Sequence, residues 1–326
     1  ISESKTFTVE SFDRDTSPFG EKLIAVKKKG KWGYMDVKGK MVIKPKFQKA
    51  HNFSEGLASV KINGKWGYIN NKGQVVIKAE YEEAAYEFSN GYAQVSKNGK
   101  WGNIDKEGNI VIPITYQDTN DYSDGLILVK KNGKYGYINI KNEMVIEPQF
   151  KEAYSFQDGL AGVMKNGKWG YIDQKGELVI SYKYSEIFSF ENGVAVVQNK
   201  DFFYGAIDKN GKTVIPFKYA YLTYPQNGLV GYTYEDKGGY DIGYLSVKTG
   251  KKAFEIIPTN NDPLQFREGL VFLAPMSDPR YNYIYTSTGQ KIKLKNKYYD
   301  LMFFNNGYAL GTINEKGTKI KILQKK

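Results

Sequence analysis

The stretch NGKWGYINNKGQVVI, residues 63–77, places a tryptophan directly before a glycine and between two turns rich in asparagine and glycine. Nearly the same sequence returns at residues 98, 132 and 166. A tryptophan or tyrosine followed by glycine occurs at intervals of 34, 35, 34, 34 and 35 residues, at Trp32, Trp66, Trp101, Tyr135, Trp169 and Tyr204. A fixed period of this length is typical of a repeat architecture built from small supersecondary units.

Each repeat predicts an antiparallel sheet of three or four strands. GLASVKI and WGYIN alternate apolar and polar side chains, and Asn63-Gly64 between them favours a tight hairpin turn. A third strand, VVI or MVI, follows a second turn. A tyrosine or phenylalanine then comes four residues after its last isoleucine, and prolines such as Pro45 fall within this gap. Proline is tolerated at a bend or on an edge strand, so the segment after the gap is expected to be a short outer strand or a structured loop.

Stacking of successive sheets explains the tryptophan. A sheet of some 34 residues cannot bury both faces alone, so the aromatic side chain is expected to fill the gap to the neighbouring sheet, and the glycine to admit a close neighbour. The predicted structural core is therefore the six aromatic residues of the Trp/Tyr-Gly pairs, and not a functional site. Small stacked sheets form either a β-propeller or an open solenoid-like stack.

The two ends of the chain favour the β-propeller, with eight or nine repeats. The last unit contains early strands and stops, whereas the N-terminal segment resembles the fourth segment of a unit, so the two segments are expected to pair and close the structure. We predict one repeat domain over 1–326, with a closing segment at 1–19 and regular repeats at 20–227. Divergent repeats follow at 228–305, and a partial closing repeat at 306–326.

The phrase G-K-W-G-Y-I-[DN]-x-x-G-x-x-V-I resembles the bacterial WG, or KWG, repeat over about residues 20–220. The resemblance implies a β-propeller-like fold and supplies no catalytic residues. Members of this family are often secreted or found at the cell surface. The resemblance therefore implies an extracellular or surface location, with a signal peptide removed before Ile1; a cytoplasmic location is the alternative.

The composition of the chain limits the classes of partner that can be expected. The net charge is +12, and only three of the 47 basic residues are arginines. Lysine is a hydrated point charge without the planar fork that reads bases, so diffuse attraction to a polyanion is favoured and nucleic acid is not expected. No apolar run reaches the length of a membrane-spanning helix. We expect a monomer that binds a protein or an anionic glycan or cell-wall polymer.

The residues offer little chemistry for catalysis. His51 is the single histidine and there is no cysteine, so a catalytic triad, a multi-histidine metal site or a cysteine nucleophile has no candidates, and His51 is interpreted as an ordinary loop residue. Aspartates such as Asp36 recur at one turn position and are interpreted as turn formers. We therefore expect no enzyme activity, no cofactor and no metal.

The period lengthens after Gly205, to 38 and then 39 residues. Extra residues in a repeat often map to loops on the binding face. Tyrosine and arginine are enriched at interface anchors, so a ligand site is predicted at Tyr232, Tyr234, Tyr240, Arg267, Arg280, Tyr281 and Tyr283. The predicted function is a non-catalytic binding module that recognises an envelope polymer, glycan or protein. The alternatives are a carbohydrate-active enzyme with carboxylates from separate blades, and an intracellular interaction scaffold.

Overall fold

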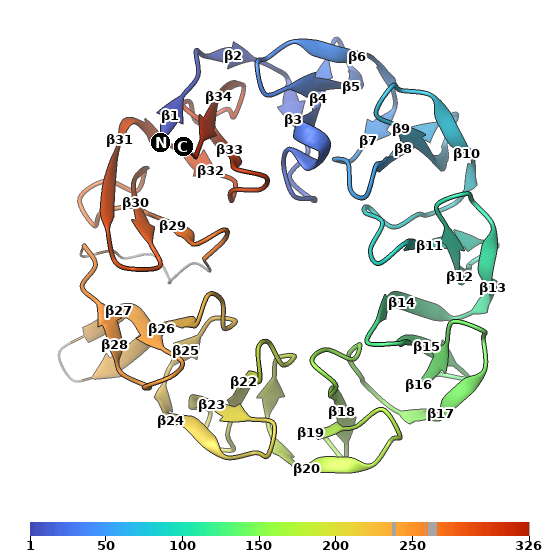
Figure 1. The fold of residues 1–326 in the computed structure, drawn as a ribbon, viewed down its shortest axis with the longest axis vertical. Coiled ribbons are helices and arrows are strands. Elements are labelled where there is room, and N and C mark those ends of the chain that lie inside the picture. Colours follow the sequence, from blue (N-terminus) through green and yellow to red (C-terminus); the bar gives the residue numbers. More distant parts are fainter. Residues whose placement is uncertain (237–238, 258, 260–265, 326) are drawn as a thin grey trace. The chain divides into compact units, whose positions relative to one another are not determined.

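The computed structural model describes residues 1–236, 239–257, 259 and 266–325. Within these residues the chain is all-β and folds as a β-propeller of nine small antiparallel sheets (Figure 1). The prediction of eight or nine short blades is confirmed. The chain groups into two compact units, which are described separately: residues 1–121, 279–282 and 293–326 form the first, and residues 122–278 and 283–292 form the second.

The first unit contains four sheets, in the order in which their strands pair. These are β3 (Ser11–Phe12), β4 (Leu23–Lys28), β5 (Lys31–Asp36) and β6 (Met41–Phe47); β7 (Lys49–Ala50), β8 (Leu57–Ile62), β9 (Lys65–Asn70) and β10 (Val75–Tyr81); β11 (Tyr92–Lys97), β12 (Lys100–Asp105) and β13 (Ile110–Tyr116); and β32 (Asp300–Leu301), β33 (Tyr308–Thr312) and β34 (Lys319–Gln324), which β1 (Ser2–Glu3) and β2 (Phe7–Thr8) complete. A short 3-10 turn, η1 (Gly20–Lys22), precedes β4.

The second unit holds most of the remaining strands. They are β14 (Asp118–Ser123), β15 (Leu126–Lys131), β16 (Lys134–Asn139) and β17 (Met144–Phe150); β18 (Ala161–Lys165), β19 (Lys168–Ile172) and β20 (Leu178–Tyr184); β21 (Glu186–Ile187), β22 (Val194–Gln198), β23 (Tyr204–Asp208) and β24 (Thr213–Tyr219); β25 (Tyr221–Leu222), β26 (Leu229–Asp236), β27 (Gly239–Ser246) and β28 (Lys252–Phe254); and β29 (Leu270–Leu273), β30 (Tyr281–Thr286) and β31 (Lys291–Tyr298). Strands β14, β30 and β31 each include residues of both units.

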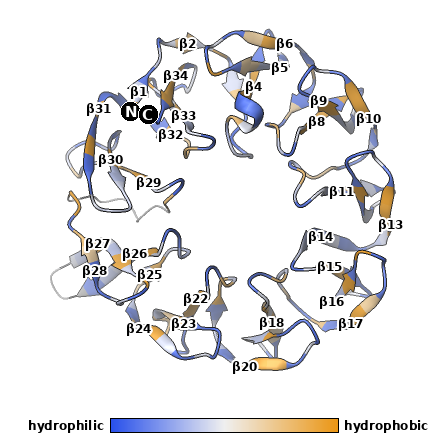
Figure 2. Cartoon of the chain, viewed as in Figure 1, coloured by the Kyte–Doolittle hydropathy of each residue, from blue (hydrophilic) through white to orange (hydrophobic). Residues whose placement is uncertain are grey.

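The predicted hairpin turn is present between β8 and β9. Asn63 and Gly64 both have positive φ, at 48° and 79°, which are the values that a two-residue turn between twisted strands requires. The third strands are edge strands, as the prolines indicated, and they continue through the proline. Figure 2 shows apolar colour on the third strands β6, β10 and β13, where Val42, Val75 and Ile110 are exposed.

The glycine of the Trp-Gly pair is explained by a bulge within its own sheet. Trp66 pairs with Tyr81 and Tyr68 with Ile77, so four residues of β10 oppose two of β9. A Cβ on Gly67 would lie 2.5 Å from the carbonyl oxygen of Ile77. The constant interval of four residues between the isoleucine of the third strand and the following tyrosine or phenylalanine is therefore explained by a β-bulge in that strand. The bulged strand passes close to the glycine. The close neighbour is the third strand of the same sheet, and not the next sheet as expected.

The deepest side chain of a repeat is the tyrosine two positions after the tryptophan. Tyr34 is fully buried, its ring centre lies 4.8 Å from that of Phe53, and its hydroxyl donates to the carbonyl oxygen of His51 at 2.7 Å. Residues of the first sheet, such as Ile43, share a core cluster with residues of the second, such as Val60. Consecutive sheets are thus held by apolar contact and by a buried hydrogen bond.

The six aromatic residues of the Trp/Tyr-Gly pairs lie at these junctions with different exposure. Trp66, Trp169 and Tyr204 are buried, whereas Trp32, Trp101 and Tyr135 are half-buried. Trp32 packs against the cluster that contains Tyr34, and Tyr135 packs against the next such cluster in the second unit.

The predicted pairing of the two chain ends is confirmed within the first unit. Ser2 pairs with Gln324 and Phe7 with Ile320, and Figure 1 shows both termini beside β1 and β34. The N-terminal segment occupies the third-strand position of the last sheet. The fourth segment of a repeat also differs from the expectation: Lys49–Ala50 pairs with β8, so it is the first strand of the following sheet and not the outer strand of its own.

In the first of the two lengthened repeats, the additional residues lie in longer strands and not in the longer loop that was expected. β26 and β27 each have eight residues, and their register runs without a break from Leu229 opposite Ser246 to Asp236 opposite Gly239. The corresponding strands of the other repeats have four to six residues. The connection at 237–238 lies outside the described residues, as do 258 and 260–265 in the second extension.

Candidate functional site

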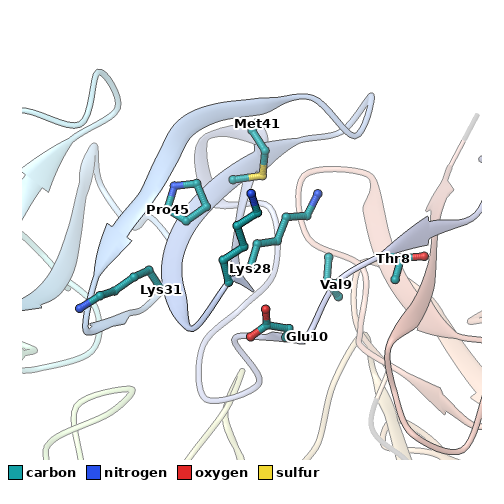
Figure 3. Close-up of a pocket in the computed structure, with 8 residues that line it drawn as sticks. Thr8, Val9, Glu10, Lys28, Lys31, Met41 and Pro45 are labelled. Carbon is teal, nitrogen blue, oxygen red and sulfur yellow. The ribbon is translucent and has the colours of Figure 1, made fainter.

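A pocket of about 570 Å³ lies between the N-terminal segment and the first hairpin. We call it the lysine pocket; it is lined by Thr8, Val9, Glu10, Lys28, Lys29, Lys31, Met41 and Pro45. Figure 3 shows Thr8, Val9 and Glu10 on the N-terminal segment and Met41 and Pro45 on β6, with the side chain of Lys31 extending away from Glu10. The Glu10 carboxylate accepts a hydrogen bond from the backbone N–H of Gly30 at 3.1 Å. The lining therefore includes three lysines and one carboxylate, and that carboxylate already bonds to the hairpin turn.

A similar pocket of about 310 Å³ lies in the second unit. Its lining includes Lys183, Lys200, Thr213 and Phe217. Thr213 and Phe217 occupy the positions on β24 that Met41 and Pro45 occupy on β6, counted from the shared isoleucine of the third strand. The repeat therefore forms a basic pocket beside the third strand in both units.

A different pocket surrounds the single histidine. We call it the histidine pocket; its volume is about 470 Å³, and it is lined by Asp13, Asp15, Lys27, Trp32, Gln48, Lys49, Ala50, His51, Lys61, Trp66, Glu83 and Tyr86. These residues belong to the first two sheets of the first unit and to the segments that connect them to each other and to the third sheet.

His51 is buried and is held by a buried carboxylate. Its Nδ1 lies 3.3 Å from Oδ1 of Asp13, and the two side chains are 8% and 3% exposed. Asp13 and His51 occupy the same position in successive repeats, because the N–H of Asp13 bonds to the carbonyl oxygen of Ala25 on β4 and the N–H of His51 to that of Ser59 on β8. His51 lies in the loop after β7, as interpreted, but it is not an ordinary loop residue, because it is buried and paired with Asp13.

His51 is stacked on two aromatic side chains. Its ring centre lies 4.2 Å from that of Tyr86 and 5.2 Å from that of Trp66. The second unit contains the corresponding pair, Tyr154 stacked on Trp169 at 4.8 Å. The histidine thus replaces a tyrosine in a contact that belongs to the repeat. The ring stacked on Trp66 is therefore an imidazole, whereas the ring stacked on Trp169 is the phenol of Tyr154.

Asp13, Asp15 and His51 place possible metal ligands within 4.8 Å of one another. Asp13, however, accepts four hydrogen bonds: from the N–H of Asp15 at 3.1 Å, the N–H of Asn52 at 2.8 Å, the hydroxyl of Thr16, and Nδ1 of His51. A carboxylate has about four lone-pair positions. A metal ion would have to displace one of these donors, so the arrangement is that of a structural anchor.

Two further carboxyl groups lie close to this cluster. Burial raises the pKa of Glu87; the N–H of Ser17, which bonds to it at 3.0 Å, opposes the rise, and the charges of Asp13 and Asp121 add to it. Burial also raises the pKa of Asp121, which accepts from the amide of Gln94. The carboxyl groups of Asp13, Glu87 and Asp121 are therefore close enough for their charges to interact.

The tyrosines predicted to bind a ligand are mostly packing residues. Tyr232 is buried, and its hydroxyl donates to Asp241 at 2.9 Å; burial first and Asp241 second raise its pKa. Tyr234 packs into the same cluster with its ring 6.0 Å from that of Tyr219. Tyr240 is exposed on β27.

The other predicted ligand residues are divided between the two units. Arg267 and Tyr283 belong to the second, where Arg267 is exposed and Tyr283 packs beside Tyr285 under the ammonium of Lys291. Arg280 and Tyr281 belong to the first. The guanidinium of Arg280 lies 5.6 Å from the ring centre of Tyr299, and burial followed by the charge of Asp300 raises the pKa of Tyr281.

A signal for the histidine pocket was present in the sequence. His51 stands where other repeats have an aromatic residue, and the aspartates of FDRD precede the first repeat. The missing information was the alignment of Asp13 with His51, because two additional residues separate Asp13 from the turn glycine Gly20.

With this geometry established, comparison with known proteins identifies the repeat. A family model described as a WG containing repeat matches residues 32–66, 66–101, 101–135, 135–169, 169–201 and 204–237. No curated protein matches the chain. The single helical segment in the described part of the chain is the three-residue η1, so no helix there has the length or hydropathy of a membrane span.

Solved structures resemble the chain at low identity. The crystal structure of a eukaryotic initiation factor aligns with a TM-score of 0.65 and 12% identity over 92% of each chain. The computationally designed Ika8 protein aligns with a TM-score of 0.47 and 10% identity, over 99% of this chain and 98% of that one. The WD40 domain of SCAP from fission yeast gives 0.41 and 10%, over 98% of each. At such identities the first of these likenesses supports the fold alone.

Proposed function

Because the chain belongs to the WG repeat family and folds as a β-propeller, we propose that it is a non-catalytic binding module for an anionic polymer of the bacterial cell envelope. A repeat β-propeller is consistent with a binding or interaction role. The observation that carries the finer proposal is the lysine pocket, whose lining includes three lysines and one carboxylate, Glu10, which is already bonded to the hairpin turn (Figure 3).

The same hairpin carries lysines in one repeat after another. In the first unit Lys65, Lys97 and Lys100 flank the corresponding turns, and in the second unit Lys131, Lys134, Lys165 and Lys168 do so. All seven are exposed. A polymer with a regularly repeated negative charge can engage several such turns, and each further contact then becomes intramolecular.

Lysine fits this kind of ligand better than arginine would. Its ammonium is a compact charge on a flexible stem, suited to diffuse attraction, whereas the arginine fork is suited to a fixed bidentate contact. Exposed charges of one sign raise the local concentration of an oppositely charged polymer, and salt screens the effect.

The proposal includes no reaction. Asp13, the most buried carboxylate near the histidine, already accepts four hydrogen bonds, which supports an anchoring role over acid-base chemistry. We place the protein outside the cell or at its surface, because an envelope polymer is met there. Release of reducing sugar from envelope glycans would support the carbohydrate-active alternative instead.

The test is binding to immobilised poly(glycerol phosphate), with dextran as the neutral polymer. The triple variant Lys28→Gln, Lys29→Gln, Lys31→Gln should bind about tenfold more weakly, since exposed contacts contribute a few tenths of a kcal/mol each. Binding of the unchanged protein should fall steadily as salt is added.

A matched control removes the same charge from the other end of the sheets. Lys38, Lys40 and Lys72 are exposed on the turns that follow the second strands, and their replacement by glutamine should leave binding within about twofold of the unchanged protein. Equal loss of binding in the two triple variants would show that net charge, and not the lysine pocket, determines binding. Retention on dextran as strong as on the polyanion would contradict the proposal.

A further inference from the structure

The histidine pocket has a composition unlike the lysine pocket. Its basic residues are Lys27, Lys49 and Lys61, and its acidic residues are Asp13, Asp15 and Glu83. Three ammonium groups and three carboxylates cancel in formal charge. In a chain of net charge +12 this balance is local, and it favours a ligand that carries no net charge.

The pocket also holds a buried donor without a partner. Trp66 is 4% exposed and lines the pocket, and its Nε1 has no hydrogen-bond partner among the residues that the structure describes. A buried N–H left unpaired reduces stability by an amount comparable to a lost hydrogen bond. Trp169, at the same position in another repeat, is 7% exposed, and its Nε1 is not among the fully buried atoms that lack a partner in the described residues. The Trp66 indole N–H is thus enclosed by the protein, while its ring forms part of the wall of the histidine pocket.

Flat aromatic surfaces complete the lining. Trp32 is half-buried and Tyr86 is 51% exposed, so both leave part of a ring open to the pocket. Ligand sites characteristically combine such apolar faces with a few polar groups in a volume of roughly 300–1,000 Å³. At about 470 Å³ the histidine pocket lies within that range.

From these features we infer that the histidine pocket binds one neutral sugar unit. A pyranose ring has a flat face of C–H groups that packs on aromatic rings, and its hydroxyls both donate and accept hydrogen bonds. Carboxylates and the Gln48 amide can accept from hydroxyls, while ammonium groups can donate to them.

This site is separate from the polyanion surface and goes beyond the proposed function. It uses none of Lys28, Lys29 and Lys31, and it selects against the charge that the lysine pocket attracts. The triple lysine variant should accordingly bind a neutral sugar as well as the unchanged protein does, so the two proposals can fail independently.

The experiment measures binding of four sugars to the full chain by saturation-transfer NMR and by tryptophan fluorescence. The neutral ligands are methyl β-glucopyranoside and methyl N-acetyl-β-glucosaminide, and the charged ones are glucuronic acid and glucosamine. At least one neutral sugar should bind, more tightly than both charged sugars and with little dependence on salt. The variant Trp32→Ala, which removes a half-buried aromatic face of the pocket, should bind it about tenfold more weakly, while the matched variant Trp101→Ala should not change the affinity.

A second variant guards against loss of folding. His51→Tyr restores the residue type of Tyr154 and its stack on Trp169, so it should fold, yet it removes the contact with Asp13 and fills the pocket. Sugar binding should be lost while the melting temperature stays within a few degrees. Absence of binding by both neutral sugars, equal loss in Trp32→Ala and Trp101→Ala, or preference for a charged sugar would each overturn the inference.

Discussion

The phenol of Tyr171 donates a hydrogen bond to the carbonyl oxygen of Phe188, 2.7 Å away and 17 residues later in the chain. Tyr171 belongs to β19 and Phe188 follows the first strand of the next sheet, so the bond joins two consecutive sheets. Tyr34, Tyr68 and Tyr137 make the same kind of bond. This contact, and not the neighbouring tryptophan, is the most buried link between repeats.

Tyr171→Phe should lower the free energy of unfolding by about 1–2 kcal/mol, because it leaves the carbonyl of Phe188 without this donor. Urea unfolding followed by circular dichroism measures the change. Tyr240→Phe is the control, since Tyr240 is exposed in the same unit. Equal stability of the two variants would mean that the bond contributes nothing.

Gly67→Ala should lower the free energy of unfolding by about 1–3 kcal/mol, because the new Cβ would lie 2.5 Å from the carbonyl oxygen of Ile77. Gly64→Asn should be nearly neutral, since no atom lies within 4 Å of a Cβ there and asparagine tolerates positive φ. Thermal melts of the two variants distinguish close approach from turn geometry. A neutral Gly67→Ala would contradict the bulge assignment.

Alkaline pH should unfold the protein through its buried tyrosines. Burial raises the pKa of Tyr137 well above its usual value of 10.0, so the folded state holds the proton more tightly than the unfolded state does. The stability from this group is complete below pH 10.0 and is lost as the pH rises above it. Tyrosinate absorbance should rise together with loss of circular dichroism, and Tyr137→Phe should make the alkaline loss less steep. Ionisation of the buried tyrosines before unfolding would exclude this coupling.

Glu87→Gln should raise the melting temperature at neutral pH. Burial raises the pKa of Glu87 above its usual 4.5, so its contribution is most favourable below that pH and declines as the pH rises through the folded pKa. Glutamine can still accept from the N–H of Ser17 but carries no charge. The gain should disappear in melts below pH 4.5. Glu107→Gln, at an exposed turn, provides the comparison and should show no pH-dependent gain.

Removal of residues 1–8 should lower stability by about 3 kcal/mol, because β34 loses its partners and Ile320 and Ile322 lose the cover of Phe7. The carboxylate of Glu3, which accepts from the hydroxyl of Tyr298 at 2.7 Å, is lost as well. A synthetic peptide of residues 1–12 added to the shortened protein should restore the melting temperature. A melting temperature that the truncation leaves unchanged would show that the pairing is dispensable.

Local chemistry in the sequence predicted most of the repeat. Asn63-Gly64 predicted a hairpin, Pro45 an edge strand, and the constant period a stack of small sheets, because turn geometry, backbone hydrogen bonding and burial depend on residues close together in the chain. The bulge over Gly67 was visible as a fixed interval, but its meaning was not, since a register shift is a property of two paired strands.

The candidate site depended on contacts that no local pattern contains. Asp13 and His51 are 38 residues apart, and they meet because equivalent positions of consecutive repeats lie side by side. The sequence by itself determined the repeat, its turns and the pairing of the two ends, since each is specified within one period or by what an incomplete unit lacks. Only the tertiary structure decided that the lone histidine is buried beside a carboxylate with an unpaired indole nearby, because burial and charge balance arise where separate sheets pack together.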